Sequence, residues 1–337
     1  MKHVFGIASH LTFNIARKII ETDSIPVSDC CFLLLRNYVI PEEYQSKFSH
    51  QLTGSFNIDA DHGRIFEGWR VWKTRQNMRT FDSQLRHLTD NDDFIWYTSI
   101  CYNDICSMVV TNEKCDGYFI IEDGLVSYEE NTQTFTGWRY WVYKYLLMPL
   151  YPRIFVLKNH MVTAEHPKFK GCIGTSEDCF PFYKQHLRVI GSPFESKVYG
   201  IKPDAIISVD PLFFKGIEND RVEILYKQVA AFVNTKHYTC VAYKFHPRFN
   251  TPNNKAYREF YQSVLSREFK GIVELPQEVV LENLLTWCKA DFYSFDSSVA
   301  LYASKDGCTC YSLMPLLQGT PAYHYCEIMD KISKTIK

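Results

Sequence analysis

The chain has 337 residues, of which 46% are hydrophobic, 22% are charged and 15% are aromatic. This composition is typical of a folded protein long enough for two domains, and it excludes an intrinsically disordered chain. The formal net charge of −1 gives no overall attraction to nucleic acid, so we expect no nucleic-acid partner and predict that any anion is held by local features.

The first half of the chain alternates strands and helices. Its strands are continuously apolar, which is typical of strands buried on both faces in a parallel sheet covered by helices. We assign residues 1–190 to a first Rossmann-like domain. The predicted strands are His3–Ile7, Cys31–Leu35, Asp93–Ser99, Tyr118–Ile121 and Arg153–Leu157, and the predicted helices are Leu11–Glu21 and one from about Asn103.

A stretch with several turn signals, between about Gln185 and Pro211, separates this series from a second one. We assign residues 205–315 to a second Rossmann-like domain and 316–337 to a C-terminal helical segment that packs back on the first domain. The predicted strands are Ala205–Val209, Tyr238–Phe245, Gly271–Leu275, Phe292–Phe295 and Cys308–Leu313, and the predicted helices are Arg221–Val233, Asn254–Ser266, Val279–Cys288, Ser297–Ala303 and Tyr325–Ile336.

The first predicted sheet delivers two carboxylates at a strand end, in Glu122-Asp123-Gly124. Ligands of open parallel sheets bind at the carboxyl ends of the strands, so this position favours a functional role. A carboxylate there can take a proton from a hydroxyl nucleophile. The alternative is an ordinary turn, in which Asp and Gly adopt the special backbone angles.

Two further motifs follow strands of the second predicted sheet. Lys244 precedes His246-Pro247-Arg248, and Ser297-Ser298 begins a helix. Alternatively, His246-Pro247 only ends a strand and a serine only caps the helix. Together they fit a phosphate site, because the helix start offers hydroxyls and free amides, the histidine can donate, and Lys244 and Arg248 add positive charge.

The order of these motifs resembles that of bacterial GT-B-fold sialyltransferases, of the lipooligosaccharide and capsular polysialic acid types. That family has an acidic-acidic-Gly triplet, an His-Pro doublet and a Ser/Thr-rich motif. Leu275-Pro276-Gln277-Glu278 also resembles the family segment whose glutamate binds the ribose. The resemblance implies an α/β, GT-B architecture, in which two Rossmann-like domains have parallel sheets facing a central cleft.

The resemblance also implies roles for individual residues. Glu122 would be the general base, with Asp123 orienting it or contacting sugar and Gly124 allowing close approach. His246, in the doublet with Pro247, would hydrogen-bond the phosphate of CMP as it leaves. Glu278 would accept from the ribose hydroxyls, with Glu282 as a competing choice, and Ser297 and Ser298 would hold the phosphate.

Enzymes of this family invert the anomeric centre and need neither a metal nor another cofactor. No Asp-x-Asp triplet appears in a plausible strand-end setting, and Asp59-Ala60-Asp61 lies in a polar stretch that does not suit a strand-end metal site. It departs from the family pattern at Asp296, an acid beside the predicted phosphate site, and in having Glu rather than Asp first in its triplet. These departures leave open which nonulosonic acid, or Kdo, is the donated sugar.

We therefore predict an inverting glycosyltransferase that moves sialic acid, or a related nonulosonic acid, from a CMP-sugar to a hydroxyl of a bacterial surface glycan, lipid-linked or not. One alternative is a GT-B transferase that uses CMP-Kdo, a UDP-sugar or a GDP-sugar. Another is a non-catalytic protein that binds a nucleotide or a glycan. A sugar-nucleotide epimerase is the third, and it would need no separate acceptor.

The twelve cysteines are scattered and several lie in apolar runs, and residues 1–18 carry no signal-peptide hydrophobic region. These features favour reduced cysteines in a cytoplasmic protein. Cys308 and Cys310 have no partner pair with zinc-like spacing, so we expect no metal. No apolar run reaches the ~20 residues of a membrane span.

Two aromatic and basic stretches remain. Trp138–Arg153 is either a patch that meets the inner face of the cytoplasmic membrane or a core helix with a few solvated cations. Trp69–Arg75 is either a grip for an acidic glycan or one face of an amphipathic helix.

Overall fold

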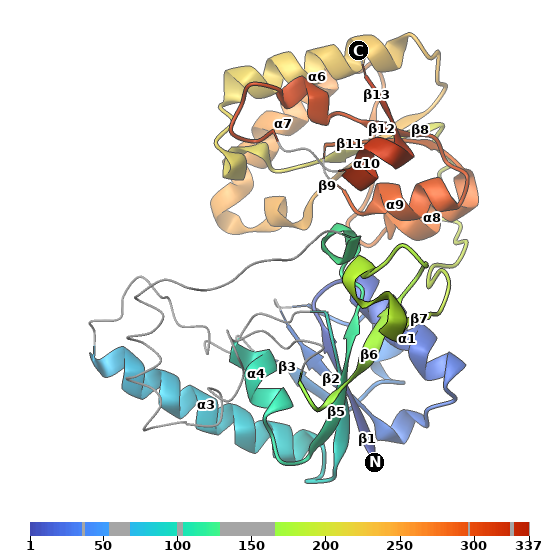
Figure 1. Ribbon diagram of the computed structural model, residues 1–337. Helices are drawn as coiled ribbons and strands as arrows, with labels where there is room; N and C mark the ends of the chain where they lie inside the picture. The colour runs from blue at the N-terminus through green and yellow to red at the C-terminus, as the bar shows by residue number, and fades with distance from the viewer. Residues whose placement is uncertain are drawn as a thin grey trace. The chain divides into compact units, whose positions relative to one another are not determined.

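The computed structural model describes residues 1–35, 38–53, 68–99, 104–128, 166–295, 297–323 and 327–336. The chain divides into two compact units, Met1–Pro193 and Phe194–Lys337, coloured blue to green and green to red in Figure 1. Each unit has a parallel sheet with helices on both faces.

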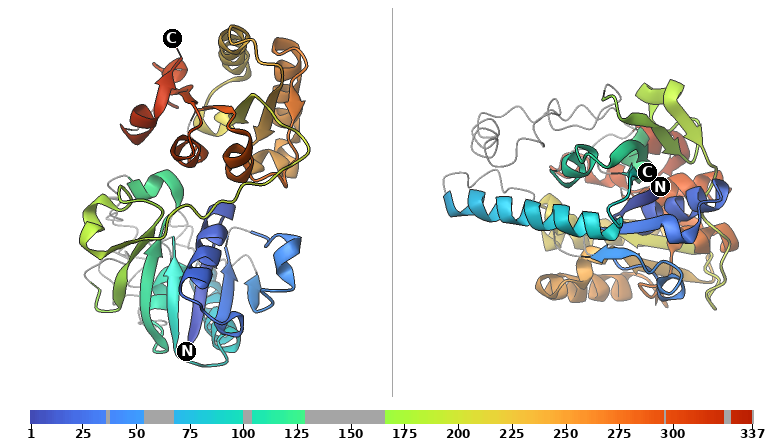
Figure 2. Two further views of the ribbon diagram at one scale, coloured as in Figure 1. Left: turned by 90° about the vertical axis from the view of Figure 1, so that its right-hand side faces the viewer. Right: turned by 90° about the horizontal axis from the view of Figure 1, so that it is seen from below.

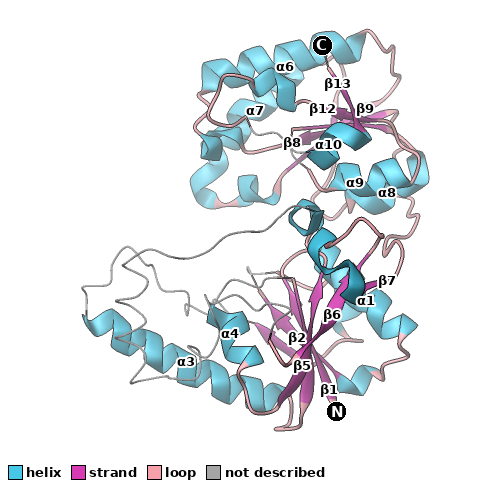
Figure 3. Ribbon diagram, viewed as in Figure 1, coloured by secondary structure: helices cyan, strands magenta, loops and turns pink. Residues whose placement is uncertain are grey.

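The first unit is built on a seven-stranded sheet in the order β3-β2-β1-β4-β5-β6-β7, in which every pairing is parallel (Figure 3). The strands are β1 Lys2–Ile7, β2 Cys30–Leu34, β3 Gln51–Thr53, β4 Phe94–Thr98, β5 Cys115–Ile121, β6 Phe169–Gly174 and β7 Leu187–Val189. The helices are α1 His10–Thr22, α2 Glu42–Gln45, α3 Gly68–Leu88 and α4 Asp104–Val110.

Helices cover both faces of this first sheet. All five residues of β2 and all five of β4 are buried, which explains their uninterrupted apolar sequence. Met78 and Phe81 of α3 pack with Val109 of α4 on one face. On the other face lies α1, which starts at a capping box: the Ser9 hydroxyl accepts from the Thr12 amide, and the Thr12 hydroxyl accepts from the Ser9 amide.

The second unit has a six-stranded parallel sheet in the order β10-β9-β8-β11-β12-β13, which is the 3-2-1-4-5-6 order of a Rossmann fold. The strands are β8 Ala205–Val209, β9 Val241–Phe245, β10 Val273–Glu274, β11 Asp291–Ser294, β12 Cys310–Ser312 and β13 Ser333–Thr335. The helices are α6 Asn219–Asn234, α7 Lys255–Glu268, α8 Leu281–Cys288, α9 Val299–Lys305 and α10 Glu327–Ile332.

The core of the second unit lies between its sheet and the helices α6 and α7, which cover one face (Figure 1). Ile207 of β8 and Tyr293 of β11 pack there with Leu225 of α6 and Val264 of α7. On the other face lie α8 and α9, and the Cys310 thiol donates to the backbone carbonyl of Ala300 in α9. None of the helices within the described ranges combines the length and hydropathy that a membrane span requires.

The predicted strands and helices before the tail that fall within the described residues are confirmed in both units, with bounds that differ by a few residues, whereas β3, β6 and β7 were not predicted. The tail is different. Residues Tyr325–Ile336 were expected to be one helix, but α10 ends at Ile332, and Ser333–Thr335 forms β13 beside β12 within the second unit. The predicted strand Arg153–Leu157 and the stretch Trp138–Arg153 lie outside the described residues.

Candidate functional site

The three motifs singled out in the sequence each follow a strand directly. Glu122 comes after β5, His246 after β9, and Ser297 lies three residues beyond the last residue of β11. Because all strands in each sheet are parallel, each motif lies at the carboxyl edge of its own sheet. That edge is where ligands bind in sheets of this kind.

Glu122 is fully buried and its carboxylate is held by two donors. The Tyr128 hydroxyl donates to Oε1 at 2.9 Å, and the Thr175 amide donates to Oε2 at 2.6 Å. Burial and the negative charge of Glu122 raise the pKa of Tyr128 well above its usual value, so this hydroxyl remains a donor. The carboxylate thus ties the end of β5 to the loop after β6.

Asp123 lies in a different environment from its neighbour. Its side chain is half-buried, and its amide donates to the Ser127 hydroxyl at 2.8 Å. Gly124 follows with a φ of 67°, a left-handed conformation that glycine adopts without strain, and begins the short 3-10 helix Gly124–Tyr128. Of the two adjacent carboxylates, Asp123 is therefore the one with access to solvent.

His246 is an exposed residue that caps the 3-10 helix Pro247–Asn250. Its Nδ1 accepts from the Arg248 amide at 3.1 Å, which leaves the proton on Nε2. Desolvation of the ring by the surrounding chain, and the charge of Arg248, lower the pKa of His246 to about 4. The histidine is therefore a neutral donor at physiological pH.

Lys244 has partners other than the expected phosphate. Its ammonium donates to the carbonyl of Gln277 at 3.1 Å and also to the carbonyl of Val279. Burial lowers the pKa of Lys244, an effect opposed by the charges of Glu282 and Glu278. Two of its three donors therefore hold the loop that carries Glu278, and at most one is left for a ligand.

The two acids proposed for the ribose differ in exposure. Glu278 is exposed at the tip of the loop held by Lys244. Glu282 lies in the first turn of α8, where burial raises the pKa of its carboxyl group. Of the two carboxylates, that of Glu278 is the more accessible to solvent.

The serines sit at the start of α9, a helix of seven residues. The Ser297 hydroxyl accepts from the Val299 amide at 3.3 Å, which is the cap role that the simpler interpretation gave it. Ser298 is the N-cap residue, and its side chain makes no cap hydrogen bond. Asp296 lies outside the described residues, as does Asp59-Ala60-Asp61.

Sequence reasoning missed three residues that shape these edges. Tyr128 and Thr175 hold Glu122, and they are 47 residues apart in the chain. Asp210, buried directly after β8, accepts from the Phe295 amide at 3.3 Å and so joins the ends of β8 and β11 where the strand order reverses. A lone acid after the apolar run Ala205–Val209 is the signal that could have indicated Asp210.

Comparison of the sequence with protein-family models and with curated protein sequences finds no match. Solved structures do resemble the chain. UDP-GlcNAc 2-epimerase from Methanocaldococcus jannaschii, in complex with UDP-GlcNAc and UDP, has a TM-score of 0.54 at 12% identity, covering 100% of this chain and 89% of that one.

Two more neighbours have similar scores. The Staphylococcus aureus MnaA–UDP co-structure has a TM-score of 0.53 at 11% identity, covering 93% of this chain and 79% of that one. The calicheamicin glycosyltransferase CalG4 has a TM-score of 0.51 at 8% identity, covering 100% of this chain and 85% of that one. With the two parallel sheets described above, these likenesses give the chain the GT-B α/β fold predicted from the sequence.

Proposed function

We propose that the protein is a glycosyltransferase that uses a nucleotide sugar. The observation that carries this proposal is the division of chemistry between its two Rossmann units. Carboxylates occupy the carboxyl edge of the first sheet, and a neutral histidine donor with hydroxyls occupies that of the second. In a GT-B fold this division suits a proton acceptor for a nucleophile and a holder for a leaving phosphate.

The proposed reaction exchanges one bond at the anomeric carbon. An acceptor hydroxyl loses its proton to a carboxylate of the first unit and its oxygen bonds to the anomeric carbon. The bond from that carbon to the phosphate oxygen breaks, and the nucleotide leaves with the electron pair. His246 donates from Nε2 to the phosphate, Ser298 offers a hydroxyl, and Glu278 accepts from the ribose.

The base is one of two adjacent carboxylates. The motif resemblance implies Glu122, but its carboxylate is enclosed and already accepts from Tyr128 and Thr175. Asp123 has access to solvent without any rearrangement. We therefore propose Asp123 as the group that receives the proton, with Glu122 as the residue that fixes its position.

A UDP-sugar is the donor to test first, because the named ligands of the similar structures are UDP and UDP-GlcNAc. The second candidate is a CMP-linked sialic acid or related nonulosonic acid, which the order of the acidic, His-Pro and serine motifs favours. In both donors the sugar is bonded to a phosphate of the nucleotide, so the proposed roles of His246 and Ser298 are the same for either donor.

The first experiment is isothermal titration calorimetry of the purified protein with UDP, UMP, CMP and GDP, in the presence of EDTA. We expect one nucleotide to bind at least about tenfold more tightly than the others. His246→Asn keeps an acceptor for the Arg248 amide and removes the Nε2 donor, and it should weaken binding about tenfold or more, since a hydrogen bond to a charged group is lost.

The matched control is His237→Asn in the same unit. His237 is exposed in a left-handed conformation that asparagine tolerates, so this variant should bind nucleotide like the wild type. Absence of binding by every nucleotide would overturn the proposal. Binding without turnover of any donor and acceptor pair would instead indicate a non-catalytic nucleotide-binding protein.

An epimerase is the second candidate function, because one of the similar structures above is a UDP-GlcNAc 2-epimerase in complex with UDP-GlcNAc and UDP. The two functions differ in their need for an acceptor. Incubation of the protein with UDP-GlcNAc alone, followed by proton NMR of the sugar, separates them. A second sugar epimer forming without acceptor would replace the transferase proposal.

A further inference from the structure

Helix α3 carries an unusual concentration of positive charge for a chain whose net charge is −1. Its 21 residues include five cationic side chains and one carboxylate, Asp82. The cationic residues are Arg70, Lys73, Arg75, Arg79 and Arg86. The apolar residues Met78, Phe81 and Leu85 are buried in the core of the first unit, whereas Lys73, Arg79 and Arg86 are exposed, so these three charges lie on the rest of the helix surface.

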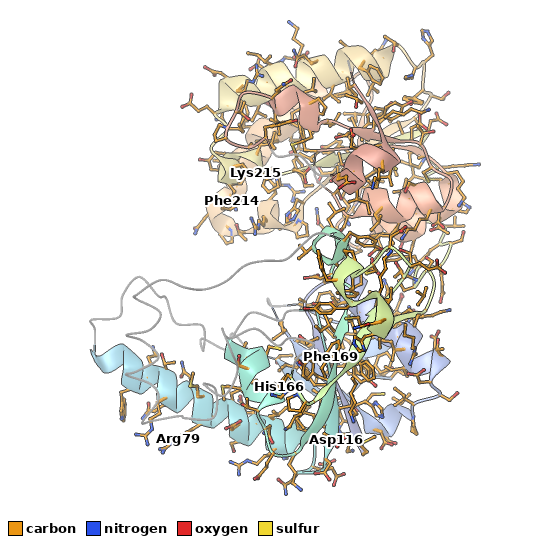
Figure 4. All side chains as sticks on the ribbon, in the orientation of Figure 1. Arg79, Asp116, His166, Phe169, Phe214 and Lys215 are labelled. Carbon is orange, nitrogen blue, oxygen red and sulfur yellow. The ribbon has the colours of Figure 1, made fainter. Side chains whose placement is uncertain are left out.

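The helical repeat aligns an aromatic residue with three of these cations. Arg75, Arg79 and Arg86 follow Trp72 by three, seven and fourteen residues, which puts all four within about 60° around the helix axis. Trp72 is 58% exposed, and Lys73, Arg79 and Arg86 are exposed as well. Arg79 is drawn on the lower side of α3 in Figure 4, and α3 lies in the foreground when the molecule is seen from below (Figure 2, right).

These cations are not used within the described part of the chain. No ion pair there involves Lys73, Arg79 or Arg86, whereas many other surface lysines and arginines of the protein do pair with a carboxylate. The Nε of Arg86 donates only to the backbone carbonyl of Asp82, at 3.4 Å. Among the described residues, the positive charge on the outward face of α3 is therefore not neutralised by a carboxylate.

The shape of this surface indicates whether it binds a small anion or an extended anionic surface. Sites for small ligands are concave, whereas these side chains stand along the convex face of one helix. A row of cations with an exposed tryptophan suits a flat anionic surface, because arginine and lysine are attracted to acidic headgroups and tryptophan favours the boundary between water and acyl chains. The apolar face of α3 is buried in the protein's own core, so the helix lies on such a surface without inserting.

We propose that the outward face of α3, from Trp72 to Arg79, docks the protein on an anionic lipid surface. The contact is centred on this half because the loop after the helix carries Asp90, Asp92 and Asp93. Lys2 neutralises Asp90 and Lys114 neutralises Asp93, which limits their repulsion without adding attraction. This inference goes beyond the proposed function and does not rest on it.

The test is co-sedimentation of the full-length protein with vesicles of phosphatidylglycerol and phosphatidylcholine in equal amounts, and with vesicles of phosphatidylcholine alone. We expect binding to the anionic vesicles only, and loss of most of it when salt rises from about 0.1 M to about 0.5 M. The double variant Lys73→Glu/Arg79→Glu should weaken binding at least about tenfold, and Trp72→Ala should weaken it less.

The control double variant is Lys227→Glu/Lys270→Glu, which makes the same charge change at two exposed lysines of the second unit. It should bind anionic vesicles nearly as the wild type does, and circular dichroism should show all variants folded. Equal loss in both double variants would overturn the assignment to α3. So would the absence of vesicle binding, or binding of the wild type to a soluble acidic polysaccharide in its place.

Discussion

Glu122 and Asp123 are neighbours in the chain, yet their side chains have opposite environments. The alternation of a strand turns one inward and the other outward as β5 ends. The inward carboxylate would be costly to bury alone, and the Tyr128 hydroxyl and Thr175 amide offset that cost by donating to it. The pair therefore combines a fixed anchor with an accessible acid.

This difference leads to a prediction for two variants. In Glu122→Gln an NH2 group replaces one carboxylate oxygen, so either Tyr128 or Thr175 loses the acceptor for its hydrogen bond. We therefore expect the free energy of unfolding to fall by about 1–3 kcal/mol. Asp123→Asn should leave stability within about 0.5 kcal/mol and lower kcat about 10²–10⁴-fold, since it removes the proposed base. Thermal unfolding and steady-state kinetics with the donor found by calorimetry measure the two effects.

The control is Glu278→Gln, the same substitution at an exposed carboxylate, which should unfold like the wild type. If Asp123→Asn retains more than about a tenth of the wild-type rate while folded Glu122→Gln loses nearly all of it, the base is Glu122, as the motif order implies.

His246 gives a prediction about pH. The pKa of this histidine is lowered to about 4 in the folded protein, against about 6.5 when unfolded, so the unfolded chain binds more protons between these values. The stabilising contribution is present above pH 6.5 and is lost as pH falls toward 4. We expect the wild type to lose more thermal stability between pH 7 and pH 4.5 than His246→Asn, whose side chain does not titrate.

Differential scanning calorimetry of both proteins at several pH values measures this difference. His3 also has a lowered pKa, caused chiefly by its burial, and it titrates in both proteins, so it cancels from the comparison. A constant difference in unfolding temperature from pH 7 to pH 4.5 would show that His246 does not titrate as described.

At the scale of elements, the loop Pro276–Val280 is fastened to β9 by side chains rather than by strand pairing. The Lys244 ammonium donates to two of its carbonyls, and the Gln277 amide donates back to the carbonyl of Phe245 at 3.2 Å. The Val280 amide donates to the Tyr199 hydroxyl. Glu278 is thereby presented on a fixed loop, although it lies outside any helix or strand.

Replacing Lys244 tests this fastening. Lys244→Met keeps the aliphatic stem and removes the donors, so we expect amide hydrogen exchange within Gln277–Val280 to rise at least about tenfold. Lys255→Met, at a lysine whose side chain is 79% exposed, should leave exchange in this loop unchanged. Unchanged exchange in Lys244→Met would mean that the other contacts hold the loop by themselves.

Strands with continuous apolar runs were predictable from the sequence, whereas β6 and most of the short edge strands were not. The strands β2, β4 and β8 are buried throughout, and their composition alone identifies them. β3, β7 and β13 have three residues each and lie at or near sheet edges, where little apolar surface is buried and the sequence signal is weak. These residues form strands because they pair with neighbouring strands, and not because of their own composition.

At the scale of the whole molecule, the fold class was predictable because strands, helices and turn signals alternate twice along the chain. The position of the motifs at strand ends was predictable for the same reason. Their partners were not, because Thr175 reaches Glu122 only through the pairing of β5 with β6, Tyr128 reaches it through the fold of the short helix after β5, and Lys244 meets the Glu278 loop only through tertiary packing. The sequence identifies the motif residues as candidates, and the contacts with their partners decide their roles.

The strand order also has a consequence for how the protein is made. In the first sheet, His3 of β1 pairs with Cys30 on one side and with Ile95 on the other, so its second partner lies 95 − 3 = 92 residues downstream. At roughly 5–20 residues per second, the ribosome needs about 5–20 s to supply it. During that interval β1 presents an apolar strand with one open edge, which is a template for pairing with another nascent chain. Chaperones that shield this edge should therefore raise the yield of the protein in a host cell.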